Sequence, residues 1–106
     1  MSIHESGQMY LETIYILSQT KSYVRAIDVG EHLGYSKPSV SRAMSILKKN
    51  GYVLVDSDGA ITLTESGMEI AQTMYTRHTV LSEMLIRLGV DEKTATEDAC
   101  RIEHVI

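Results

Sequence analysis

The amino-acid sequence predicts a mostly α-helical protein with a small β-hairpin, arranged as a winged helix-turn-helix followed by a helical region. Three observations support this fold class. Apolar residues recur at helical spacing over much of the 106-residue chain. A glycine-containing turn separates a short predicted helix from a basic one, and two short β-type runs flank an Asp-Gly turn directly after the basic helix. These elements follow one another in the order of a winged helix-turn-helix.

Apolar spacing and a terminal glycine predict the first two helices. Residues 7–20 form the first helix, whose buried face consists of Tyr10, Leu11, Ile14, Ile16 and Leu17. Residues 26–33 form a short second helix, which Gly34 ends as a C-cap residue. The side chains expected to face inward from this second helix are Ile27, Val29 and Leu33.

A third helix is predicted for residues 37–50. Ser36 is its N-cap, and Pro38 lies in the first turn, where its missing N–H costs nothing. The pair Asn50-Gly51 ends the helix. Its expected buried side chains are Val40, Met44 and Leu47.

The hairpin spans residues 52–63 and places a turn between its two β-type runs. This hairpin is the expected wing beside the DNA backbone. Its tip carries Asp56 and Asp58, so we expect the tip itself to stay away from phosphate.

Two helices complete the chain. Thr64 caps a long helix over residues 65–88 that Gly89 ends, and Asp91 caps a last helix that runs to Ile106. We therefore divide the chain into a winged helix-turn-helix DNA-binding domain, residues 1–64, and a helical region, residues 65–106.

The net charge of −4 is unevenly distributed. Residues 1–64 carry six basic and six acidic side chains, whereas residues 65–106 carry four basic and eight acidic ones. Residues 37–49 hold four positive charges and no negative one. A local basic helix and an acidic C-terminal region indicate two different electrostatic roles.

The third helix is a candidate DNA-recognition helix. Its small hydroxyl side chains would allow close approach to DNA, and the forked guanidinium of Arg42 can bind guanine or phosphate. Lys48 lies near the helix end, where a cation also suits the helix dipole, so its charge has a second explanation. The expected DNA-binding residues are Ser36, Lys37, Pro38, Ser39, Ser41, Arg42 and Lys48.

The last helix carries a candidate metal-ligand set. Cys100, Glu103 and His104 share one helix face, and together they offer a thiolate, a carboxylate and an imidazole. Met9 and Glu12 share a face of the first helix in the same way, and the long helix adds His78. Thioether and thiolate favour Fe(II), Zn(II) or Co(II), whereas carboxylates and imidazoles also suit Mn(II).

Each of these residues also has an ordinary structural explanation. Met9 and Cys100 could be core residues, Glu103 and His104 a surface pair, and His78 a simple helix residue. His4 and His32 have no comparable neighbours, and we expect both at the surface. The spacing alone leaves the choice between a metal site and a satisfied core open.

The motifs resemble the diphtheria-toxin-repressor and manganese-transport-regulator family of metal-dependent bacterial repressors. The resemblance covers nearly the whole chain and is most specific at Met9 and in the final stretch around Cys100. The matching stretches are residues 9–15, 36–41, 63–67, 77–78, 89–91 and 99–105.

This resemblance implies a homodimer of winged helices joined through a helical dimerisation region. It also implies that a divalent metal binds between the two parts and promotes binding to a palindromic operator in double-stranded DNA, which would control metal-homeostasis genes. The positions that match ligands of the iron-responsive branch are Met9, His78, Cys100, Glu103 and His104, while Glu12 matches a ligand of the manganese branch. The set implies Fe(II) as the favoured cofactor and Mn(II) as the next.

The sequence departs from the iron-responsive branch in several places. Ser82 and Thr96 stand where that branch has a glutamate and a histidine, so a copy of its second metal site is not implied here. A differently built pair of sites that uses Glu12 and His78 stays open. Arg42 replaces a glutamine, so the operator sequence is not carried over. The chain stops two residues after His104, where family members continue with further helices, as expected of a truncated chain.

Several other classes of protein fit poorly. The absence of a His-Glu-x-x-His motif, a phosphate loop or a nucleophile–base pair argues against an enzyme such as a small metal-dependent hydrolase. A single cysteine, no secretory signal and no long apolar stretch predict a cytoplasmic protein with no membrane partner. A metal-independent winged-helix regulator remains the main alternative, and a protein-interaction module would leave the basic helix unexplained.

Overall fold

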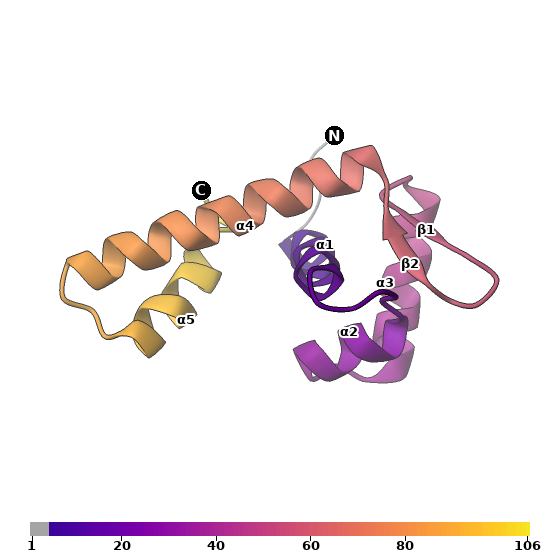
Figure 1. Ribbon diagram of the computed structural model, residues 1–106, viewed down its shortest axis with the longest axis horizontal. Coiled ribbons are helices and arrows are strands. Elements are labelled where there is room, and N and C mark those ends of the chain that lie inside the picture. Colours follow the sequence, from indigo (N-terminus) through magenta and orange to yellow (C-terminus); the bar gives the residue numbers. More distant parts are fainter. Residues whose placement is uncertain (1–4) are drawn as a thin grey trace.

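The computed structural model describes residues 5–106 and confirms the predicted fold class. In chain order, the elements are α1 (Glu5–Ser18), α2 (Ala26–Leu33), α3 (Lys37–Lys49), β1 (Val53–Val55), β2 (Ile61–Leu63), α4 (Glu65–Arg87) and α5 (Glu92–Ile102). Helices α1 to α3 and the hairpin form one part of the molecule, and α5 packs under the far half of α4 (Figure 1). Helix α4 therefore extends across both parts.

Local chemistry explains where the helices begin. The predicted caps Ser36, Thr64 and Asp91 each accept a hydrogen bond from a backbone N–H three residues later. Gly34 adopts the left-handed conformation, with φ of 73°, and ends α2 as predicted. These confirmed caps fix the short turn between α2 and α3.

The core of the first part lies where α1, α2, α3 and the hairpin meet. Its most deeply buried side chains include Leu11, Ile14, Val29, Val40 and Val53. The predicted inward face of α3 is confirmed, because Val40, Met44 and Leu47 are all buried.

The wing is a two-stranded antiparallel hairpin. Val53 pairs with Leu63, and Val55 pairs with Ile61. Ile61 also donates its backbone N–H to the carbonyl of Val24 at 2.7 Å, which ties the wing to the segment before α2. At the tip, the Asp56 carboxylate accepts backbone N–H groups of the turn itself.

Two sequence expectations were wrong. Ile27 is 66% exposed, because it lies about 200° around α2 from the buried Val29 and therefore faces away from the core. The last helix does not run to Ile106: α5 ends at Ile102, and residues 103–105 form a turn. Of the two histidines expected at the surface, His32 is exposed, and His4 lies outside the described residues.

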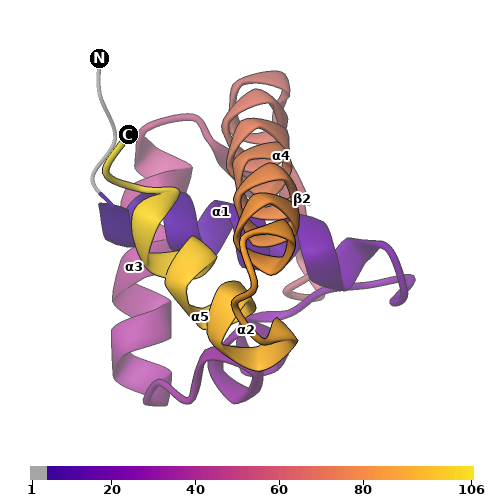
Figure 2. The same cartoon turned by 90° about the vertical axis from the view of Figure 1, so that its left-hand side faces the viewer.

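Helix α4 links the two parts of the molecule. Helix α1 crosses under its N-terminal half at a steep angle, and α5 packs beside its C-terminal half (Figures 1 and 2). Within residues 5–106, no helix is both long and apolar enough to cross a bilayer.

The start of α4 is fixed against the wing at Gly67. A Cβ atom placed on Gly67 would lie 2.1 Å from the carbonyl oxygen of Tyr52, which is part of the backbone and cannot move aside cheaply. The same carbonyl accepts the N–H of Thr64 at 3.0 Å. Glycine is therefore required where α4 passes over the entry to β1.

Replacing Gly67 by alanine should destabilise the protein by roughly 1–3 kcal/mol, because either α4 or β1 must shift to remove the clash. The free energy of unfolding in urea measures this effect. Ser66→Ala is the matched control, since Ser66 is exposed in the same helical turn and its loss should cost less than about 0.5 kcal/mol. Equal stabilities for the two variants would contradict the steric argument.

Candidate metal centre

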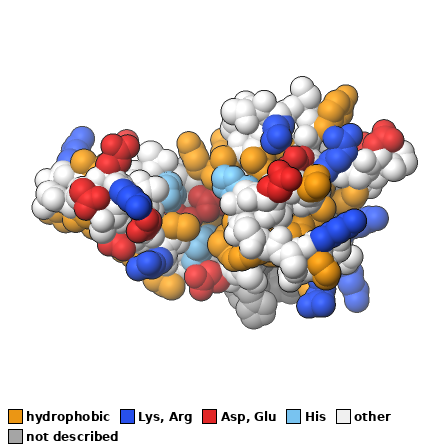
Figure 3. Space-filling model, turned by 90° about the horizontal axis from the view of Figure 1, so that it is seen from below, with side chains coloured by type: hydrophobic (Ala, Val, Ile, Leu, Met, Phe, Trp, Pro, Cys, Tyr) orange, Lys and Arg blue, Asp and Glu red, His pale blue; other side chains and the backbone are white. Residues whose placement is uncertain are grey.

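Three elements bring polar side chains together where the two parts of the molecule meet. Helix α1 contributes Glu12, α4 contributes His78, and the end of α5 contributes Glu103 and His104. Figure 3 shows histidine and acidic side chains gathered in the crevice between the two parts. Its carboxyl groups are shielded from bulk solvent: Glu12 is 6% exposed and Glu103 is fully buried.

Glu103 is the centre of this cluster. Its Oε2 lies 2.8 Å from His78 Nδ1, and its Oε1 lies 3.2 Å from His104 Nε2. His104 Nε2 is also 4.0 Å from Glu12 Oε1. Glu12, Glu103 and His104 can each present one ligand atom within 4.8 Å of the others, so the three residues could hold one ion.

Two polar atoms inside the cluster lack a hydrogen-bond partner among the described residues. These atoms are Glu103 Oε1 and His104 Nε2, which face each other without hydrogen-bond geometry. A buried acceptor without a donor is costly, and a carboxylate beside an imidazole lone pair is the arrangement that a cation stabilises. The residues present therefore fit a divalent metal ion.

Burial also changes how the carboxyl groups titrate. Desolvation raises the pKa of Glu12 to about 8, with further contributions from its hydrogen bond to Glu103 and from the negative charge of that residue. Burial raises the pKa of Glu103 as well, while the hydrogen bond from Glu12 opposes that rise. At neutral pH, the raised pKa favours a proton on Glu12 in the metal-free cluster.

The other two proposed ligands lie at the edge of the cluster. Met9 is half-buried one helical turn before Glu12, and Cys100 is exposed one turn before Glu103 and His104. Partial desolvation of its sulfur, followed by the charges of Glu103 and Glu12, raises the pKa of the Cys100 thiol. The structure thus gathers Glu12, His78, Glu103 and His104, and leaves Met9 and Cys100 on the rim.

The end of α5 is held by residues that sequence analysis gave no role. Arg77 donates from Nη1 to the carbonyl oxygens of Glu103, at 3.3 Å, and Ile106, at 3.1 Å. Gln8 places its Oε1 3.0 Å from His104 Nδ1. Position Gln8 lies four residues before Glu12, so the same-face spacing on α1 was the one available signal for it.

The predicted DNA-binding residues lie on the surface of the other part. Every one of Ser36, Lys37, Pro38, Ser39, Ser41, Arg42 and Lys48 is exposed. Tyr35, in the preceding turn, packs its ring edge-to-face on Tyr10 at 5.9 Å while remaining 43% exposed. The basic side chains of α3 are therefore free of the core, as a solvated face or a DNA-reading face requires.

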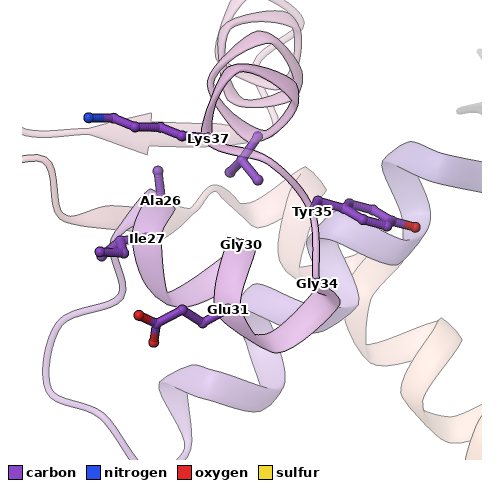
Figure 4. A pocket seen from close by; sticks show the side chains of 8 residues that line it. Ala26, Ile27, Gly30, Glu31, Gly34, Tyr35 and Lys37 are labelled. Atoms are coloured by element: carbon purple, nitrogen blue, oxygen red, sulfur yellow. The ribbon is translucent and has the colours of Figure 1, made fainter.

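A cavity of about 340 Å³ opens beside the start of α3 (Figure 4). Figure 4 shows Ile27 and Glu31 projecting from α2, with Lys37 and Tyr35 on the segment that leads into α3. The exposed Ile27 lines this cavity. Its walls are mainly apolar and hold no cluster of metal-ligating groups, so the candidate centre remains the cluster around Glu103.

Two family models together match nearly the whole chain. The iron dependent repressor N-terminal DNA binding domain matches residues 2–61, and the iron dependent repressor metal binding and dimerisation domain matches residues 64–106.

Individual proteins show the same similarity. The HTH-type transcriptional regulator MntR of Lysinibacillus sphaericus is 34% identical over 99 residues, which are 93% of this chain and 71% of the relative. An HTH-type transcriptional regulator of Methanocaldococcus jannaschii is 33% identical over 104 residues, which are 96% of this chain and 83% of the relative.

Two solved structures are also similar to the model. A manganese-dependent transcriptional repressor in complex with manganese superposes with a TM-score of 0.85 at 30% identity, covering 94% of this chain and 46% of the other. The IdeR protein of T. acidophilum superposes with a TM-score of 0.83 at 26% identity, and the match covers 100% of this chain and 49% of the other. This chain spans about half the length of those solved structures.

The raised pKa of Glu12 predicts how the stability of the metal-free protein depends on pH. Between pH 4.5 and about 8, folded Glu12 holds a proton that the unfolded chain has released, so rising pH favours unfolding. The free energy of unfolding, measured in chelator, should fall with a slope of up to about 1.4 kcal/mol per pH unit.

Glu12→Gln tests this assignment, because the amide imitates the protonated carboxyl and cannot release a proton. In this variant, the free energy of unfolding should depend much less on pH than in the wild type. Glu69→Gln, which changes an exposed carboxylate on α4, should keep the wild-type dependence of the free energy of unfolding on pH. A Glu12→Gln variant that declines as steeply as wild type would assign the pH dependence to another group.

Proposed function

Because the chain belongs to the iron-dependent repressor family, we propose that it is a DNA-binding transcriptional repressor whose operator affinity rises when a divalent metal binds. The observation that carries this proposal is the buried, uncompensated donor pair of Glu103 and His104 at the contact between α1 and α5. We also keep the proposed division into a DNA-binding domain, residues 1–64, and a metal-binding and dimerisation region, residues 65–106.

The proposed ligands come from both parts of the molecule. They are Met9 and Glu12 of α1, His78 of α4, and Cys100, Glu103 and His104 at the end of α5. A divalent ion would supply the positive charge that the buried carboxylates lack. Glu12 is on α1, which packs against α2 and α3, so fastening it to Glu103 and His104 would fix α3 relative to α4 and α5.

The metal site is coupled to DNA binding only if the ion binds the conformation that can bind DNA more tightly than the conformation that cannot. A coupling of about 1–3 kcal/mol would raise operator affinity by roughly 5–150-fold. The exposed α3 residues would contact DNA, with Arg42 as the proposed base-reading or phosphate-binding side chain.

We propose a homodimer as the active form. Large apolar side chains remain exposed on the far half of α4 and after α5: Val80, Met84, Ile86, Leu88, Val105 and Ile106. A second copy would cover this surface and set two α3 helices about one DNA turn, roughly 34 Å, apart on a palindromic operator. Such a regulator acts where the chromosome lies, in the cytoplasm.

The identity of the metal depends on the two rim residues. Glu12, His78, Glu103 and His104 form a hard carboxylate and imidazole set that suits Mn(II), the ion named for the similar solved repressor. The thioether of Met9 and the thiol of Cys100 add softer ligands and favour Fe(II). We propose Fe(II) first and Mn(II) next.

Removing one cluster ligand should abolish the metal response without removing DNA binding itself. Glu103→Gln keeps the volume of a fully buried side chain while weakening its affinity for a cation. In anisotropy titrations with a duplex selected from a random library, this variant should show no gain from Fe(II) or Mn(II), whereas wild type should gain roughly 5–150-fold.

Arg42→Ala tests whether DNA binding and metal binding are separable functions. It should weaken DNA binding and leave metal affinity unchanged, because Arg42 is exposed on α3, in the other part of the molecule from Glu103. Lys93→Ala, which removes an exposed charge from α5, should alter neither. A metal response that survives in Glu103→Gln would remove Glu103 from the ligand set, whereas a wild-type protein without any metal response would favour a metal-independent regulator.

Replacing a soft rim ligand by a carboxylate should shift metal preference towards Mn(II). For Cys100→Asp or Met9→Asp, competition titration should show the Mn(II)-to-Fe(II) affinity ratio rising by at least about tenfold, or about 1.4 kcal/mol. Thr94→Asp adds the same carboxylate to an exposed position of α5 and should leave the ratio unchanged. An unaltered ranking in both rim variants would remove Met9 and Cys100 from the ligand set.

A further inference from the structure

Gln8 connects α1 to the imidazole of His104. Its side-chain Oε1 lies 3.0 Å from His104 Nδ1, across a sequence separation of 96 residues. The opposite nitrogen of the ring, Nε2, faces the carboxylates at 3.2 Å from Glu103 Oε1 and 4.0 Å from Glu12 Oε1. The ring therefore has a different partner on each side.

A neutral imidazole carries one proton, and only the nitrogen without that proton can bind a metal. A proton on Nδ1 would be donated to Gln8 and would leave the Nε2 lone pair directed at the cluster. A proton on Nε2 would instead point at Glu103 and close the site to a cation. The Glu103 carboxylate, 3.2 Å from Nε2, favours the second tautomer, so the acceptor on the Nδ1 side decides between the two.

Water cannot easily replace Gln8 in this role. The His104 side chain is only 2% exposed, so an Nδ1–H without Gln8 would be a buried donor with no partner. Gln8 itself lies one helical turn before Glu12, on the same face of α1. One helix thus supplies both a proposed ligand and the group that orients a second ligand.

We propose that Gln8 is a positioning residue that holds His104 in the Nδ1–H tautomer and so keeps Nε2 available to a divalent metal ion. This inference rests on the proposed metal-dependent function but concerns a residue outside the proposed ligand set. Hydrogen-bond acceptors behind metal-bound histidines typically change metal affinity by about 10–100-fold when they are removed.

The test compares four proteins in the metal-free state. Gln8→Met keeps the length of the side chain and removes the acceptor, whereas Gln8→Glu keeps an acceptor. Gln72→Met makes the same change as Gln8→Met at an exposed position of α4. Thermal unfolding in chelator establishes that each variant is folded.

Long-range ¹H–¹⁵N NMR of the imidazoles reads the tautomer directly, and His104→Gln assigns the signals. Wild type, Gln8→Glu and Gln72→Met should show the Nδ1–H tautomer at His104, and Gln8→Met should shift towards Nε2–H. An Nε2–H tautomer in the wild type, or no change in Gln8→Met, would overturn the proposal. This measurement needs no metal, so it decides the role of Gln8 even if the chain proves to bind no ion.

Metal affinity provides the second measurement. The free Mn(II) signal in electron paramagnetic resonance should show about 10–100-fold weaker binding in Gln8→Met and near wild-type binding in Gln8→Glu and Gln72→Met. A folded Gln8→Met variant with wild-type Mn(II) affinity would overturn the positioning role. If wild type itself binds neither Mn(II) nor Fe(II), the proposed function fails instead.

Discussion

The contact between the end of α5 and α1 depends on one buried carboxylate. Glu103 is fully buried, yet it contacts His78 of α4 and His104 beside it, and its burial raises its pKa. A charge in such a place is costly unless it is compensated. In the metal-free protein Glu103 Oε1 and His104 Nε2 have no hydrogen-bond partner among the described residues, so a cation would supply the compensation that these two atoms lack.

Most of the fold could be predicted from the sequence because the ends of the helices are decided by neighbouring residues. The caps at Ser36, Thr64 and Asp91 and the left-handed Gly34 are decided by neighbouring residues, and each was confirmed. Ile27 was misplaced because an eight-residue helix has too few apolar positions to define its buried face. The overlong last helix has a similar cause, since no residue in 103–106 signals that Ile102 is the helical end.

The candidate metal site could be predicted only in part from the sequence. Spacing on a single helix could group Cys100 with Glu103 and His104, but it could not say that α1 and α4 meet them, nor that Glu103 would be buried while Cys100 stays exposed. The packing of α1 and α5 against α4 decides those differences. Gln8 and Arg77 act through contacts spanning 96 and 26 to 29 residues, which local pattern analysis does not detect.

The close approach of Gly67 to the Tyr52 carbonyl fixes the start of α4 against the wing. A helix of 23 residues is about 35 Å long, so a rotation of the wing by only about 5° that carries α4 with it moves the far end of the helix by about 3 Å. Small rearrangements near the wing are therefore amplified at the opposite end of the molecule. In the proposed dimer, a small motion of this kind would change the distance between the two α3 helices.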